Sequence, residues 1–157
     1  MLFKNVLVPY DESEHAVSAL HVALGMVGDD AEAQVHVVTV VSIGAIPGPS
    51  IDSDSFGDPL SSTTPLEYDS VMGALLHRVR ADMEGMINDA KDGASCKIVS
   101  TAIIAGSPVE GIAEYVTNHD IDLVVMGRRG LGALRGMLGS VSFGVLRSVD
   151  VPVLTVK

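Results

Sequence analysis

Residues 121–142 read IDLVVMGRRGLGALRGMLGSVS and carry the strongest fold signal in the chain. The apolar run Ile121–Met126 predicts a buried strand. Six of the sixteen glycines of the chain lie within or just after this stretch, at Gly127, Gly130, Gly132, Gly136, Gly139 and Gly144. A short helix is expected over Ser140–Ser148. The stretch therefore predicts a strand that passes through a glycine-rich loop into a helix.

The same alternation of strand and helix extends over the rest of the chain. Further apolar runs predict strands at Val6–Pro9, Val35–Val41, Lys97–Ala105 and Val151–Val156. Helical spacing predicts helices over Ala16–Val27, capped by Asp11 or Ser13 and ended by Gly28, over Met72–Ala90, and from the capping box Ser107–Glu110 onward. This order, without hairpin turns, predicts one α/β domain over residues 1–157. Its sheet should be parallel, with helices on both faces.

Two segments of the chain stand out from this alternation. Residues 42–65 are rich in Gly, Pro, Ser, Thr and Asp, a composition that cannot form a regular element and predicts a long mobile loop. Pro152 cannot donate a ladder hydrogen bond, which places the last strand at an edge of the sheet.

Composition excludes several classes of protein. The chain has 157 residues, 47% of them hydrophobic, with 10 basic and 20 acidic side chains and a net charge of −10. Its apolar runs are too short for a membrane helix, its start does not resemble a signal peptide, and a single cysteine, Cys96, fits a reducing compartment. We therefore expect a cytoplasmic protein that binds neither membrane nor nucleic acid, because its field is negative and aromatic residues are few.

Positive charge is concentrated in one segment of this acidic chain. No acidic residue lies between Asp122 and Asp150, whereas four arginines do, at Arg128, Arg129, Arg135 and Arg147. Glycine-lined backbone, arginines and a helix N-terminus with Ser140 and Ser142 hydroxyls are the parts of a phosphate site. The alternative is a glycine-rich turn with a plain serine N-cap, which leaves the charge segregation unexplained. A Walker A motif is excluded because no lysine lies in this segment.

Five segments together resemble the universal stress protein family: Val6–Ser13, Gly106–Pro108, Val124–Gly130, Gly139–Ser142 and Val151–Val156. The resemblance implies a doubly wound five-stranded parallel sheet in the order 3-2-1-4-5. It also implies a homodimer, for which the strand at Val151–Val156 offers an edge. For the glycine-bearing branch of the family it implies ATP binding.

The resemblance also implies roles for particular residues. Asp11, beside Pro9 and Tyr10, would meet the adenine or ribose, and Val40 would present backbone groups to adenine. The glycine segment would line ribose and phosphates through Met126, Gly127, Arg128, Arg129 and Gly130. The β- and γ-phosphates would be held by Gly139, Ser140, Val141 and Ser142. Mg²⁺ or Mn²⁺ would bind through the phosphates, without protein ligands of its own.

One departure from the family pattern bears on the ligand. The family has nine residues before the Gly-Ser pair, and here Leu131–Leu138 supplies eight. The shorter loop either still accepts ATP or leaves a site of AMP or ADP size.

Three hypotheses of function remain open. The first is a nucleotide-binding regulator of stress response or signalling. The second is a weak ATP hydrolase or adenylyl-transfer enzyme, although no carboxylate or histidine lies between Asp122 and Asp150 to act as a general base. The third is a dimeric interaction module without ligand. We expect no catalytic residues, and at most slow ATP hydrolysis.

Overall fold

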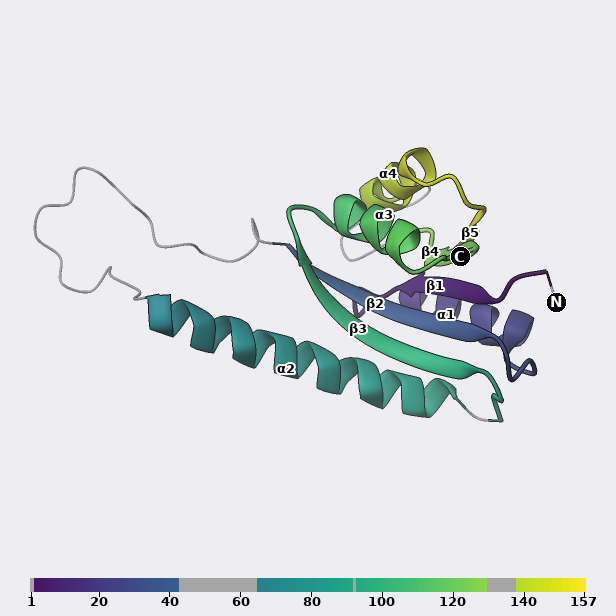
Figure 1. Ribbon diagram of the computed structural model, residues 1–157, viewed down its shortest axis with the longest axis horizontal. Coiled ribbons are helices and arrows are strands. Elements are labelled where there is room, and N and C mark those ends of the chain that lie inside the picture. Colours follow the sequence, from purple (N-terminus) through teal and green to yellow (C-terminus); the bar gives the residue numbers. More distant parts are fainter. Residues whose placement is uncertain (1, 43–64, 92, 130–137) are drawn as a thin grey trace, which may run out of the picture.

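The computed structural model describes residues 2–42, 65–91, 93–129 and 138–157. They form a five-stranded parallel sheet in the order β3-β2-β1-β4-β5, with four helices (Figure 1). The elements are β1 (Asn5–Pro9), α1 (Glu14–Val27), β2 (Gln34–Ser42), α2 (Pro65–Ala90), β3 (Lys97–Ala105), α3 (Pro108–Asn118), β4 (Leu123–Gly127), α4 (Ser140–Ser148) and β5 (Val153–Val156). The predicted fold class and strand order are confirmed.

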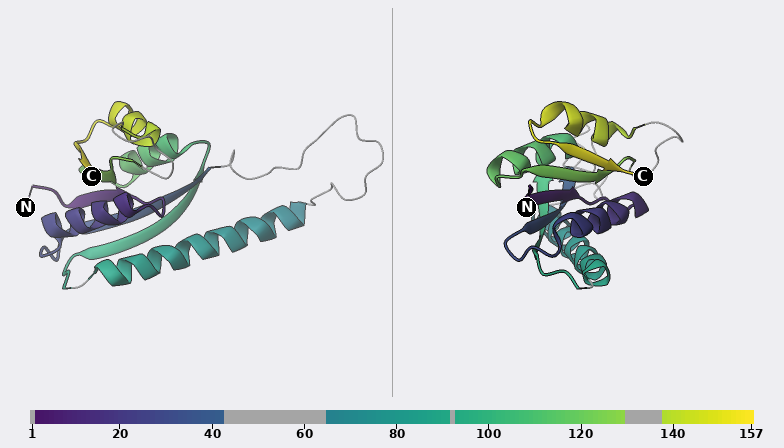
Figure 2. Two further views of the ribbon diagram at one scale, coloured as in Figure 1. Left: turned by 180° about the vertical axis from the view of Figure 1, so that it is seen from behind. Right: turned by 90° about the vertical axis from the view of Figure 1, so that its right-hand side faces the viewer.

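The sheet separates two apolar cores. Val6 and Val8 of β1 pack with the buried faces of α1 and α2, whereas Leu7 packs with α3 and α4 on the opposite face. Figure 2 shows these two helical layers from behind and from the side. Successive side chains of a strand point to opposite faces, so a continuous apolar run such as 6–8 supplies both cores.

The pairing of β1 with β4 is shorter than its pairing with β2. β1 pairs with β2 as far as Pro9 and Val38. Its pairing with β4 consists of two residue pairs and ends at Leu7 and Val124. The chain winds in opposite directions on the two sides of this β1–β4 pair, and ligands of open α/β sheets bind at such a reversal, beyond the carboxyl ends of the strands.

Several predicted boundaries are confirmed. β3 and α4 begin and end as expected, Gly28 ends α1, and α3 begins with Ser107 as its N-cap and Pro108 in its first turn. The N-cap of α1 is Ser13, whose side chain accepts from the Ala16 N–H. For α1 and α3, local capping chemistry was sufficient, because the cap side chains of Ser13 and Ser107 contact a backbone N–H three residues further on.

Other boundaries were wrong. The helix expected from Met72 begins at Pro65, and the rest of the segment predicted as a loop, residues 43–64, lies outside the described residues. The last strand begins at Val153 instead of Val151, because pairing with β4 starts at Val124–Val153 and Pro152 contributes its carbonyl, which accepts from the Val124 N–H at 3.0 Å. β5 does lie at the sheet edge, as Pro152 predicted.

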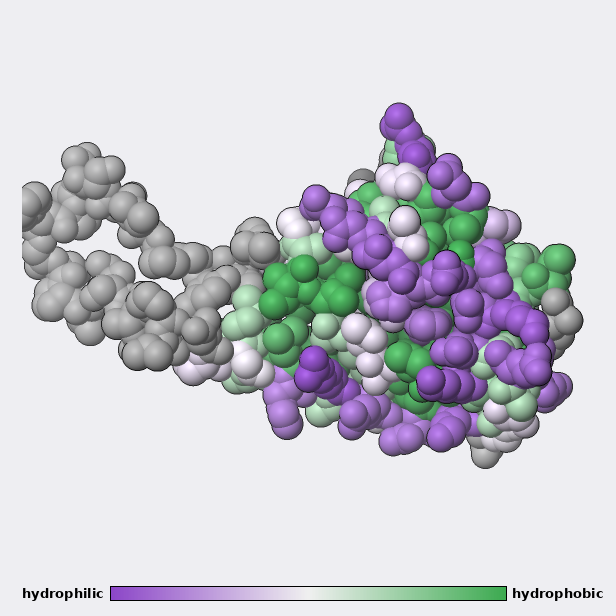
Figure 3. Space-filling model, viewed as in Figure 1, coloured by the Kyte–Doolittle hydropathy of each residue, from purple (hydrophilic) through white to green (hydrophobic). Residues whose placement is uncertain are grey.

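The surface is largely hydrophilic on the face shown in Figure 3, with apolar residues gathered near the carboxyl ends of β2 and β3. Ile104, the second-to-last residue of β3, is 46% exposed. Within the described ranges no helix is both long and apolar enough to cross a membrane. Cys96 is a buried free thiol.

Candidate functional site

The end of β1 is tied to the middle of β2 by two hydrogen bonds. Pro9 is the last residue of β1, and the N–H of Tyr10 donates to the carbonyl of Val38 at 2.8 Å. The hydroxyl of Thr39 donates to the carbonyl of Tyr10 at 3.0 Å. Both backbone groups of Tyr10 are therefore engaged, and they hold the segment that follows β1 beside β2.

Asp11 orients the start of α1. One of its carboxylate oxygens accepts from both the N–H and the hydroxyl of Ser13, while the side chain itself is exposed. Between them, Glu12 has a left-handed backbone, with φ of 64°. The alternative helix cap at Asp11 is thus excluded in favour of Ser13. Strained non-glycine backbone of this kind persists where surrounding contacts impose it, and it is frequent at functional sites.

Tyr10 and Val40 lie on opposite faces of the sheet. Tyr10 packs against the core under α1 and α2, and Val40 against the core under α3. Burial raises the pKa of the Tyr10 phenol, and the carboxylates of Glu12, Asp82 and Asp11 raise it further. Tyr10 is therefore a neutral phenol at neutral pH.

Gly127 allows β4 to end directly against the first turn of α1. A Cβ at Gly127 would lie 2.7 Å from the Cβ of His15 and 3.0 Å from its carbonyl carbon. Met126, just before it, is buried in the core under α3 and α4, so it can offer a ligand its backbone alone. Glycine is needed at 127 because any side chain would push α1 away from β4.

The segment after Gly127 is anchored at both ends. The N–H of Arg128 donates to the carbonyl of Val156 in β5 at 2.7 Å, and the N–H of Gly139 donates to the carbonyl of Arg128 at 2.9 Å. The hydroxyl of Ser142 donates to the carbonyl of Gly127 at 2.9 Å. Gly130, predicted to line the phosphates, lies outside the described residues.

The N-terminus of α4 lies beside the end of β4. Gly139 is its N-cap, Ser140 is exposed, and Val141 packs partly against the core. The first N–H groups of a helix have no intrahelical acceptor, and they form the positive end of the helix dipole. This end of α4 can therefore receive an anion through backbone N–H groups and the Ser140 hydroxyl.

The three arginines of the segment that lie among the described residues fall into two groups, and Arg135 lies outside the described residues. The Nε atoms of Arg128 and Arg129 are buried and have no hydrogen-bond partner among the described residues. Arg147 lies in the last turn of α4, with its guanidinium 5.6 Å from the centre of the Phe143 ring. The backbone of Arg128 is hydrogen-bonded to Gly139 at the N-terminal end of α4, whereas Arg147 lies at the opposite end of that helix.

Two of the predicted site residues, Tyr10 and Gly127, make contacts that the sequence did not suggest. The hydroxyl of Thr39 ties Tyr10 to the middle of β2, and His15 at the start of α1 lies against Gly127 at the end of β4. No sequence signal marked Thr39 or His15 for these contacts, although a glycine directly after a buried strand is a sign of close backbone approach.

Two other features lie apart from this site. A depression of about 250 Å³ lies between the C-terminal ends of α1 and α2 and is lined in part by His21, Gly25, Asp29 and Ala94. It contains none of the predicted site residues. Over the described ranges, no group of three His, Cys, Asp or Glu side chains is placed to hold a metal ion.

The described residues form an α/β protein in which the N-terminus of α4 lies beside the end of β4, next to the reversal point of the sheet. The model of the universal stress protein family matches residues 2–157, and the chain belongs to that family. The "Universal stress protein in QAH/OAS sulfhydrylase 3'region" of Thermus aquaticus is 32% identical over 161 aligned residues, which cover 99% of this chain and 100% of the relative.

Solved structures with this fold include the hypothetical protein MJ0577, with a TM-score of 0.76 and 24% identity, covering 100% of this chain and 97% of that one. A universal stress protein in complex with cAMP has a TM-score of 0.65 and 21% identity, covering 100% of this chain and 98% of that one. At these identities the likeness shows the fold.

Proposed function

We propose that residues 1–157 form a single nucleotide-binding domain that acts as a cytoplasmic regulator of stress response or signalling. The ligand is an adenine nucleotide, ATP in the first place, bound where β1, β2 and β4 end. The observation that carries this proposal is the N-terminus of α4, where Ser140 is exposed, next to the sequence pair Arg128 and Arg129, whose buried Nε atoms lack partners among the described residues.

The arrangement supports a bound phosphate chain. A buried donor without a partner costs free energy, so such groups in native proteins mark places where a ligand, ion or water completes the contacts. Arginine and helix N-termini both favour phosphate oxygens. The described residues proposed for this region are Gly127, Arg128, Arg129, Gly139, Ser140, Val141 and Ser142. Gly130 belongs to the proposal on the sequence pattern alone.

The nucleoside is proposed to lie toward β1 and β2. Asp11, which directly follows Pro9 and Tyr10, is exposed, and its carboxylate has a second oxygen besides the one that accepts from Ser13. Carboxylate oxygens accept from ribose hydroxyls, and Val40 offers backbone groups near the end of β2. The family member in complex with cAMP supports an adenine ligand.

We propose binding without efficient catalysis. Proton abstraction needs a base within hydrogen-bond reach of the attacking water. Asp11 is engaged with Ser13, and His15 lies against Gly127 on the side of α1. A divalent ion, Mg²⁺ or Mn²⁺, would be held through the phosphates, whose oxygens supply ligands of the kind that such ions prefer.

The dimer belongs to the same proposal. β5 forms one edge of the described sheet, and Leu154 on it is exposed. An edge strand presents unpaired backbone groups that a second copy can satisfy through a two-fold contact. Sedimentation at micromolar concentration should give a dimer, and a monomer would remove this part of the proposal.

The nucleotide is tested first on the purified protein. The chain has no Trp and three Tyr, so a bound adenine dominates the ultraviolet spectrum near 260 nm. Mass spectrometry of the supernatant after denaturation identifies AMP, ADP, ATP or none. Calorimetry with each nucleotide and magnesium follows. Recovery of AMP or ADP alone would indicate that the short loop restricts the site, and absence of both nucleotide and binding heat would overturn the proposal.

Charge placement gives the second test. Ser140→Asp puts a carboxylate at the start of α4, and Gly130→Asp does so in the glycine segment. Both should weaken nucleotide binding through repulsion of the phosphates. Ser140→Ala should have a modest effect, because the backbone N–H groups of the helix remain. Unchanged affinity in both Asp variants would contradict the placement of the phosphates.

A further inference from the structure

The hydrogen bond from Ser142 to Gly127 joins the start of α4 to the end of β4. The two residues are fifteen positions apart in the chain, and Ser142 is 3% exposed. A second bond runs from the Gly139 N–H to the carbonyl of Arg128, so in sequence it lies inside the first. These two bonds form the β4–α4 clamp. They join the residues just before the glycine segment to the residues just after it.

The hydroxyl of Ser142 already donates its one proton within this clamp. A serine hydroxyl has one proton to donate and otherwise accepts. Because the Ser142 proton goes to the Gly127 carbonyl, the oxygen retains acceptor lone pairs, which repel an anion. Ser142 was expected to donate to phosphate through this hydroxyl, whereas the exposed Ser140 hydroxyl is the one directed away from the core.

The carbonyl of Gly127 needs such a donor. It belongs to the last residue of β4, which is fully within the buried part of the sheet. The pairing of β1 with β4 ends at Leu7 and Val124, three residues earlier, so β1 supplies no ladder donor at this level. A buried carbonyl without a donor is costly, and Ser142 supplies one from α4.

We propose that Ser142 is a positioning residue: its hydroxyl fixes the N-terminus of α4 against the end of β4 and so holds the anion-binding N–H groups in place before nucleotide arrives. This inference rests on the proposed function. Groups that are held in their bound arrangement beforehand lose less freedom on binding, which raises affinity. The contact of Ser142 with nucleotide is then through its backbone, and its side chain acts through the position of the helix.

The test uses Ser142→Ala and a matched control, Ser148→Ala. Ser148 lies on the same helix, and its hydroxyl also donates to a backbone carbonyl, that of Gly144, at 2.9 Å, but it is exposed and away from β4. Amide hydrogen exchange is followed at Gly139 and Phe143 in the nucleotide-free protein, and ATP affinity is measured by calorimetry. Ser142→Ala should speed exchange at Gly139 and Phe143 about fivefold or more and weaken ATP about tenfold. Ser148→Ala should change neither.

The two readouts separate the possible outcomes. Exchange at the wild-type rate in Ser142→Ala, with or without weaker ATP binding, would overturn the clamp. Faster exchange with unchanged ATP affinity would overturn the positioning role. Ser142→Thr, which keeps the hydroxyl, should restore both values. If Ser142→Ala fails to fold, Ser142→Cys, with similar size and a weak donor, repeats both measurements. A wild type that binds no nucleotide refutes the proposed function, and exchange still decides the clamp.

Discussion

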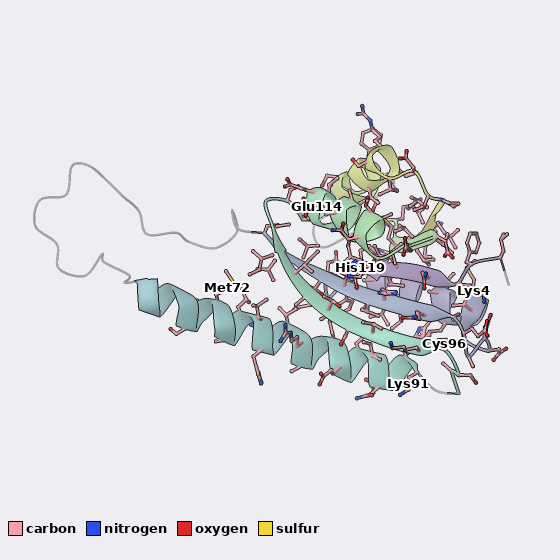
Figure 4. The ribbon with its side chains drawn as sticks, in the orientation of Figure 1. Lys4, Met72, Lys91, Cys96, Glu114 and His119 are labelled. Carbon is pink, nitrogen blue, oxygen red and sulfur yellow. The ribbon has the colours of Figure 1, made fainter. Side chains whose placement is uncertain are left out.

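Nδ1 of His36 lies 3.0 Å from the hydroxyl of Tyr115, and this contact joins β2 to α3 inside the protein. The ring of His119 stacks on that of Tyr115, with centroids 3.7 Å apart and planes 8° apart. Thr101 of β3 approaches the same hydroxyl at 3.4 Å. Figure 4 shows His119 at the end of α3 that faces the sheet. This cluster links α3 to β2 and β3.

The His36 contact should make stability depend on pH. Burial lowers the pKa of His36, and positive charge from His119 and Lys97 lowers it further. An unfolded histidine titrates at about pH 6.5. Between that pH and the lower pKa of His36 in the native state, the histidine is protonated in the unfolded chain but neutral in the folded protein. The free energy of unfolding should therefore fall as the pH falls below about 6.5 and be insensitive to His36 above it.

Urea unfolding at a series of pH values measures this slope. His36→Asn, which cannot titrate, should flatten it. His77→Asn removes an exposed histidine of α2 and should leave it as in the wild type. An undiminished slope in His36→Asn would mean that the acid sensitivity has another origin.

The close approach of Gly127 to His15 predicts a steric effect. Gly127→Ala places a methyl group 2.7 Å from the Cβ of His15, so α1 or β4 must shift. The expected cost is about 1–3 kcal/mol of unfolding free energy, measured in urea. Gly85→Ala on exposed α2 meets nothing within 4 Å and should instead stabilise by about 0.5–1 kcal/mol. Equal effects of the two substitutions would refute the packing at Gly127.

The two groups of arginines predict unequal effects on nucleotide binding. Arg129→Gln removes a charged donor whose Nε lacks a partner among the described residues, and Arg128→Gln does the same. Each should weaken ATP binding about tenfold to a hundredfold, the size of a hydrogen bond to a charged group. Arg147→Gln removes the same charge at the other end of α4 and should leave calorimetric affinity close to that of the wild type. Equal losses in all three would point to a diffuse effect of net charge.

The left-handed backbone of Glu12 predicts a stabilising substitution. Its φ of 64° is unfavourable for a side chain with a Cβ, and glycine adopts it freely. Glu12→Gly should raise the free energy of unfolding by about 1 kcal/mol, the lower end of the cost of such strain. Glu114→Gly makes the same chemical change at an exposed position inside α3 and should lower stability by about 1 kcal/mol. Thermal unfolding of both variants decides the prediction, which a loss of stability in Glu12→Gly would contradict.

Local chemistry predicted much of the fold. The bounds of β3 and α4, the Ser107 cap and the Gly28 end of α1 were all readable because each depends on residues a few positions apart. The start of α2 was missed for a physical reason. Apolar periodicity reports burial, and near its start Val71 is 56% exposed, so no apolar stripe marks the first turns of that helix.

By itself, the amino-acid sequence determined the α/β class, the alternation of elements and the concentration of glycine and arginine between β4 and α4. Tertiary structure alone decided that His15 lies against Gly127, that Thr39 holds Tyr10, and that the Ser142 hydroxyl is bound to a backbone carbonyl. Periodicity and caps follow from neighbours along the chain. A hydrogen bond between residues fifteen apart, or a contact between residues 15 and 127, depends instead on how strands and helices pack.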